Sequence, residues 1–130
     1  MEVSVRANRI LRSMKSYQDV SVLNSTQLSL VKLGPGEVCI GVYENSAGDL
    51  SDCIFITNKG LHLLANKIEK FISYTDIVDI KSPLNKTNDT NICLTLKDGE
   101  TSEIEIKNGS GRFKDVFEFL RFLDRVVNQT

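Results

Sequence analysis

The chain has 130 residues, 41% of them hydrophobic, which suits one domain with a single closed core and excludes a large multidomain enzyme. Its 16 Lys and Arg residues nearly balance 17 Asp and Glu residues, and the net charge of -1 argues against a general nucleic-acid binder, because no strong overall field attracts a polyanion. No apolar run approaches the roughly 20 residues of a membrane-spanning helix, and no secretory signal opens the chain, so we expect a cytoplasmic protein, soluble or peripherally membrane-associated.

The N-terminal region carries a basic amphipathic pattern. Residues 1–35 hold five basic and two acidic side chains, whereas the rest of the chain holds eleven and fifteen. Over residues 3–17, apolar residues recur every three or four positions, which predicts a helix with Arg6, Arg9 and Arg12 opposite its apolar stripe. Such a helix suits a lipid surface, a partner groove or docking on its own domain.

A second, shorter helix is predicted next along the chain. It covers residues 26–33, with Ser25 as its cap and Gly34-Pro35 as its end. We therefore expect residues 1–33 to form a helical extension ahead of the main domain.

After Gly36 the apolar period changes from helical to two, and β-branched and aromatic residues dominate. This pattern predicts seven strands, over residues 37–43, 53–57, 61–65, 68–74, 77–82, 91–97 and 101–107. Asp98-Gly99 is the strongest hairpin signal, because both residues accept positive φ. Short turns between the strands indicate antiparallel hairpins.

The strongest helix signal covers residues 112–127. Its expected sheet-facing side contains Phe113, Val116, Phe117, Leu120, Leu123 and Val127. Beside this face lies a second apolar flank, made by Phe119, Phe122 and Val126. We predict that this flank packs on the N-terminal stripe of Ile10, Leu11, Met14 and Tyr17, either within one chain or between two copies.

Three local motifs accompany this order of seven strands and one C-terminal helix. They are PGE at 35–37, IFITNKGL at 54–61 and ISYTDI at 72–77. The series resembles the GRAM and bacterial PH-like families of the pleckstrin-homology (PH)-like superfold. The resemblance covers about residues 34–127 and implies, for residues 34–130, a mainly β domain: a seven-stranded antiparallel bent barrel or sandwich capped by the C-terminal helix.

Lipid-binding members of that superfold gather Lys and Arg near the first strand pair and its loop to meet phosphoinositide phosphates. The corresponding loop here, residues 44–52, has three acids and no base. A weaker basic patch is expected instead from Lys59, Lys67 and Lys70 around two hairpin turns.

The sequence predicts no catalytic, metal or cofactor site. His62, the only histidine, is expected to be a surface or edge-strand residue, pointing away from the side of Leu61 and Leu63. The three cysteines form no CxxC pair and are expected to be small buried hydrophobes in a reducing compartment; they are Cys39, Cys53 and Cys93.

The expected function is a non-enzymatic PH-like interaction module that binds a protein partner or self-assembles. Its partner surface is expected to combine the apolar flank with the N-terminal arginines: Phe119, Phe122, Val126, Arg6, Arg9 and Arg12. The alternative is a peripheral membrane module that binds anionic lipid through the N-terminal helix and the basic turns at Lys59, Lys67 and Lys70.

Overall fold

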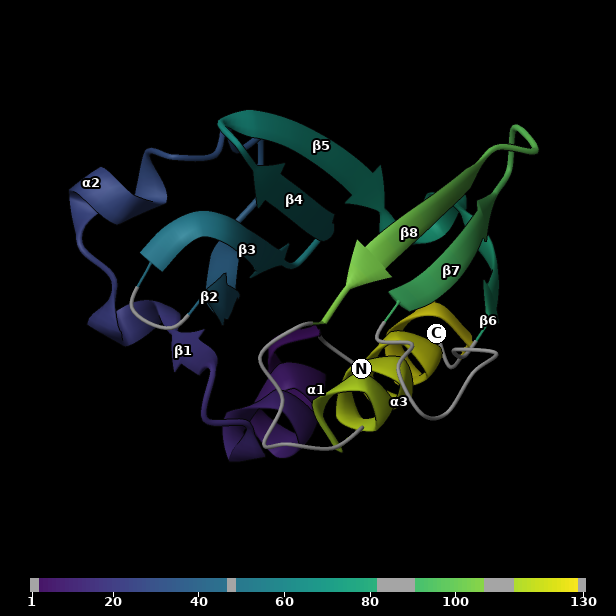
Figure 1. The fold of residues 1–130 in the computed structure, drawn as a ribbon, viewed down its shortest axis with the longest axis horizontal. Coiled ribbons are helices and arrows are strands. Elements are labelled where there is room, and N and C mark those ends of the chain that lie inside the picture. Colours follow the sequence, from purple (N-terminus) through teal and green to yellow (C-terminus); the bar gives the residue numbers. More distant parts are fainter. Residues whose placement is uncertain (1–2, 47–48, 82–90, 107–113, 129–130) are drawn as a thin grey trace.

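The computed structural model describes residues 3–46, 49–81, 91–106 and 114–128 (Figure 1). Phe113, expected in the core, lies outside these residues. The helices are α1 (Val3–Ile10), α2 (Ser25–Leu28) and α3 (Lys114–Asn128), and the short 3-10 turns are η1 (Leu11–Ser13), η2 (Val20–Val22) and η3 (Tyr74–Asp76). The strands are β1 (Tyr17–Asp19), β2 (Cys39–Ser46), β3 (Asp49–Thr57), β4 (Gly60–Ala65), β5 (Ile68–Ser73), β6 (Ile77–Lys81), β7 (Asn91–Leu96) and β8 (Thr101–Glu105).

The strands form two antiparallel sheets. One has five strands in the order β1-β2-β3-β4-β5, and the other has three in the order β6-β7-β8. The expected mainly β fold with a C-terminal helix is confirmed, and each of the seven predicted strands has a counterpart. The two sheets remain separate, however, and do not close into a barrel.

The hairpin turns obtain positive φ in different ways. Asn66 and Lys67, between β4 and β5, have φ of 52° and 66°, as a two-residue hairpin loop requires. At the predicted Asp98-Gly99 turn only Gly99 has positive φ, at 88°. That loop is longer than the predicted two residues: the Leu96 N–H donates to the Glu100 carbonyl across three intervening positions.

Both N-terminal helices are shorter than their patterns predict. Helix α1 ends at Ile10, and the chain is extended at Tyr17 because β1 pairs with β2, Tyr17 lying opposite Tyr43. This long-range pairing overrides the local helical period. Helix α2 is a single turn capped by Asn24, whose side chain accepts from the Gln27 N–H, rather than by the predicted Ser25.

The main core lies between the two sheets and the pair α1 and α3. Figure 1 shows α1 (purple) beside α3 (yellow). Its fully buried side chains include Leu11, Tyr43, Ile56, Leu61, Ile92, Leu94, Phe119, Phe122 and Leu123. A buried hydrogen bond of 3.0 Å from the Tyr43 hydroxyl to Asp115 Oδ2 ties the start of α3 to β2.

A second core covers the opposite face of the five-stranded sheet. Its buried members are Val31, Cys39, Val42, Cys53, Phe55 and Leu64, and side chains from residues 20–33 pack over them. Residues 3–33, expected as an extension, therefore contribute to both cores: α1 on one face of the sheet and the α2 region on the other (Figure 1).

Helix α3 presents a different face from the one expected. Phe117, predicted to be buried, is 50% exposed, whereas Phe119 and Phe122 are fully buried and Val126 nearly so. The reason is α1, which packs on the flank and turns it into an inner surface. The predicted contact between flank and N-terminal stripe thus occurs within one chain. In the described part of the chain, no helix is both long and apolar enough to cross a bilayer.

Candidate functional site

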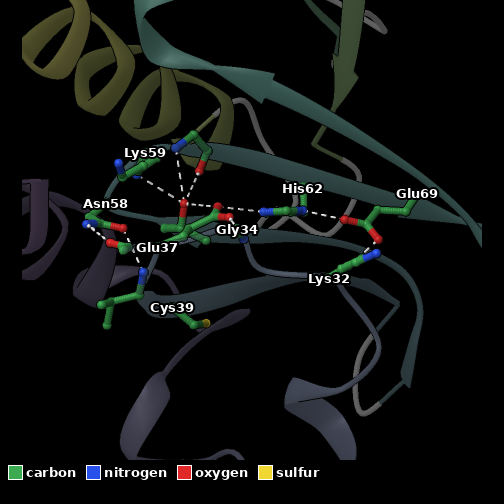
Figure 2. Close-up of polar contacts among 12 residues, drawn as sticks. Lys32, Gly34, Glu37, Cys39, Asn58, Lys59, His62 and Glu69 are labelled. Carbon is green, nitrogen blue, oxygen red and sulfur yellow. Dashed lines mark hydrogen bonds and ion pairs between the residues drawn. The ribbon is translucent and has the colours of Figure 1, made fainter.

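A buried polar network surrounds His62 (Figure 2). The expectation of a surface or edge histidine is wrong: His62 is only 2% exposed. It lies on β4 on the face that carries the second core, and residues 32–37 cover that face beside it.

The imidazole ring lies between two carboxylates. His62 Nε2 is 2.6 Å from Glu37 Oε2, and His62 Nδ1 contacts Glu69 Oε2. The Phe71 ring covers one side, with ring centroids 4.7 Å apart. A carboxylate oxygen only accepts, so both ring nitrogens donate to their partners when the ring is the doubly protonated imidazolium. In that protonation state the ring is a cation held between two anions.

Two backbone N–H groups and one side-chain hydroxyl hold the two carboxylates in turn. Glu37 Oε1 accepts from the Gly34 N–H at 2.8 Å, and Glu37 Oε2 accepts from Thr57 Oγ1 at 2.6 Å. Glu69 Oε1 accepts from the Lys32 N–H at 3.2 Å. Through these bonds the network fastens the 32–37 segment to both β3 and β5.

Thr57 extends the network into the β3–β4 turn. Its Oγ1 accepts from the Lys59 and Gly60 N–H groups, each at 3.1 Å, and its carbonyl accepts from the Tyr74 hydroxyl at 2.9 Å. Two of the motifs that suggested a family resemblance, at 35–37 and 54–61, therefore meet at this point.

The Glu37 carboxyl illustrates the electrostatic balance of the site. Burial acts to raise its pKa, but hydrogen bonds from Thr57, from the Gly34 N–H and from His62 favour the charged form and together outweigh burial. The net result is a lowered pKa, so Glu37 stays ionised over a wider pH range than an ordinary Glu.

This geometry is that of a structural clamp. A histidine that acts as a general acid or base must direct one ring nitrogen to a substrate, and both nitrogens of His62 face the protein's own carboxylates. Among the described residues, no group of three or more His, Cys, Asp or Glu side chains is arranged to hold a metal ion. Cys39 and Cys53 are buried as predicted, and burial raises their pKa values to about 11 and about 12, while Cys93 is only partly buried.

A second feature is a groove between β6 and α3. It has a volume of about 400 Å³ and is lined by Val78, Asp79, Ile80, Leu120, Arg121, Asp124, Val127 and Asn128. Strand β6 is an edge of its sheet, and its register with β7 shifts between Ile77 and Asp79. Val78 at that shift is 55% exposed.

The structure does not assemble the predicted basic patch. Lys59 precedes β4 and Lys67 follows it, so the two lie at opposite ends of a strand about 17 Å long at roughly 3.4 Å per residue. Consecutive hairpin turns of an antiparallel sheet necessarily alternate between its ends. Lys70 lies on β5, where its Nζ donates to Ser102 Oγ of β8.

The predicted partner-binding residues separate into two groups. Phe119, Phe122 and Val126 are core residues covered by α1 and are not part of the protein surface. On α1 and η1, Arg6 is partly buried, whereas Arg9 and Arg12 are exposed.

Sequence reasoning missed three residues of the network: Glu37 and Glu69, whose carboxylates contact His62, and Thr57, whose hydroxyl donates to Glu37. One signal was available for His62 itself. It stands among Leu61, Leu63 and Leu64, so apolar residues occupy both odd and even positions of the strand. Since these positions point to opposite faces, such a strand is covered on both faces. Nothing in the sequence pointed to Glu69, which lies in an edge strand whose first four residues are exposed.

Comparison of the chain with protein-family models, with curated proteins and with solved structures found no match in any of the three.

Proposed function

We propose that the chain is a non-enzymatic, PH-like interaction module that binds an extended segment of a partner protein in the groove between β6 and α3. The PH-like part of the proposal is supported by seven consecutive antiparallel strands followed by the helix α3. The binding part is carried by one observation: an edge strand lies beside an open groove formed with a helix.

An edge strand has a row of N–H and C=O groups that a further strand can use. Within the described chain, β6 has β7 as its one strand neighbour, which leaves its other side for an incoming segment. Main-chain hydrogen bonds then supply affinity, and alternate side chains of the partner enter the groove.

The helical wall of the groove combines the apolar side chains of Leu120 and Val127 with polar ones from Arg121, Asp124 and Asn128. Phe117, Leu120, Asp124 and Val127 follow one another at intervals of three and four, so they share one face of α3. Phe117 is half exposed at the N-terminal side of this face, continuing the line of Leu120 and Val127. Opposite it, Val78 adds an exposed apolar side chain on β6.

The test begins with peptides selected for binding to the wild-type protein and then measured against Val78→Lys. We expect at least tenfold weaker binding, because the new charge would be desolvated by the added strand, and we expect amide shifts on binding to concentrate in β6 and α3. The matched control is Val22→Lys, since Val22 is also exposed but lies on η2, outside the groove. Its affinity should stay within twofold of wild type.

Failure to select any peptide, or equal binding to both variants, would contradict the proposal. Co-sedimentation with anionic vesicles at two salt concentrations tests the lipid alternative. Salt-sensitive binding that Arg9→Glu abolishes and Val78→Lys leaves intact would favour the membrane module.

A further inference from the structure

A second groove is lined by residues of both sheets, including residues of the edge strands β5 and β8. Figure 1 shows these two strands near each other, at the junction of the sheets. It has a volume of about 550 Å³. The two strands belong to different sheets, and the bond that the structure gives between them is a side-chain contact, from Lys70 Nζ to Ser102 Oγ at 3.2 Å. Neighbouring strands of one sheet are joined by main-chain hydrogen bonds. Here the Lys70 side chain spans the space between β5 and β8 instead.

The floor of this groove is apolar. Ile54 and Ile104 are buried beneath it, and Leu63 is partly buried beside them. At one side Ile68 of β5 is 72% exposed. An edge strand with such an exposed Ile is a site where another chain can pair.

The rim of the groove is predominantly acidic. Among the described residues that line it, Asp52, Glu103 and Glu105 are acidic and Lys70 is basic. Glu103 and Glu105 are both exposed and stand two positions apart on β8, so they lie on the same face of that strand. They form a short row of negative charge along the groove.

We infer that this groove takes up an extended partner segment in which apolar and basic residues alternate. An extended segment sends successive side chains to opposite sides. One set would reach the floor of Ile54, Leu63 and Ile104, and the other would meet the acidic row. Lys or Arg at every second position matches the spacing of Glu103 and Glu105, and cross-strand pairs of opposite charge are favourable.

Lys70 occupies the groove until such a segment arrives. Its side chain is exposed overall, so it can turn to solvent and release Ser102. This second site is separate from the groove between β6 and α3, and it does not depend on the function proposed above.

The test uses a short labelled peptide in which Val and Lys alternate, and measures its binding by fluorescence anisotropy. We expect Glu103→Lys to weaken binding at least tenfold, and Lys70→Ala to strengthen it severalfold because the bridging side chain is gone. The matched control is Glu100→Lys, which makes the same charge change in the exposed β7–β8 turn and should alter binding less than threefold. Thermal melting of each variant checks that it is folded.

Two peptide controls separate this site from general charge attraction. A peptide of the same composition with its Lys residues grouped at one end should bind at least tenfold more weakly, as should one with Glu in place of Lys. Equal binding of the alternating and grouped peptides, or equal weakening by Glu103→Lys and Glu100→Lys, would overturn the inference.

Three further outcomes also count against it. No binding of the alternating peptide would refute it outright. Loss of binding in Val78→Lys would assign the peptide to the β6 groove, so that the earlier proposal stands and this one fails. Dimerisation of the chain alone, abolished by Glu103→Lys, would make a second copy the occupant.

Discussion

His62 lies in a strand whose two faces are both covered, so its ring nitrogens must find partners inside the protein. Glu37 and Glu69 provide them from opposite sides. Removing one member of a buried charged group leaves the others without compensation, which is why such networks respond strongly to single substitutions.

We expect Glu37→Gln to lower the free energy of unfolding by about 3 kcal/mol at pH 7, the size of change seen when one partner of a buried pair is removed. Because the pKa of Glu37 is lowered in the folded state, its contribution is full above the unfolded pKa and is lost as pH falls through the folded pKa. The difference between variant and wild type should therefore begin to shrink as pH falls past the ordinary Glu pKa of about 4.3, which applies to the unfolded chain, and should disappear below the lowered pKa of the folded state. Urea unfolding at several pH values measures it.

Glu100→Gln is the control for that series, since Glu100 is exposed in a turn and should change stability by less than about 0.5 kcal/mol. A Glu37→Gln effect that is small at pH 7, or that does not diminish on acidification, would contradict the clamp.

At the scale of elements, α3 shows what sequence periodicity can and cannot predict. The apolar positions correctly predicted a helix, but they span too wide an arc to say which part faces the sheet. Only the docking of α1 decides this, and that contact joins opposite ends of the sequence. The strands were predictable for the opposite reason, because alternation and turn residues are local.

The two phenylalanines of α3 provide a direct comparison. Phe119→Ala should lower stability by about 3–5 kcal/mol, because a fully buried ring in contact with the rings of Tyr43 and Phe122 leaves a cavity. Phe117→Ala should cost less than about 1 kcal/mol, since half of its side chain is in solvent. Chemical denaturation of both variants measures the two losses of stability. A larger loss of stability for Phe117→Ala than for Phe119→Ala would contradict the orientation of α3.

At the scale of the whole molecule, the N-terminal region covers both faces of the five-stranded sheet. Sequence patterns predicted the helices and the apolar stripe of this region. They also indicated that it is an extension ahead of the main domain, not a part of its core. It could not show that Tyr17 begins a strand or that residues 20–33 cover a second core, because both depend on partners far along the chain.

Deleting residues 1–20 should therefore expose Phe119, Phe122 and Val126, as α1 and β1 are both lost. We expect aggregation, or new binding of a hydrophobic dye together with a lower melting temperature. Arg9→Ala, which alters only an exposed side chain of α1, is the matched control and should melt like the parent. A soluble deletion variant with unchanged mass and melting temperature would show that α1 does not cover the flank.

The contact between α1 and α3 also has a consequence for how the chain is made. During translation α1 leaves the ribosome first and its partner α3 more than a hundred residues later. At about 5–20 residues per second, the apolar stripe of α1 waits on the order of ten seconds for the helix that buries it. We therefore expect the nascent chain to hold an uncovered amphipathic helix, a segment that chaperones bind, until α3 has emerged and can pack on it.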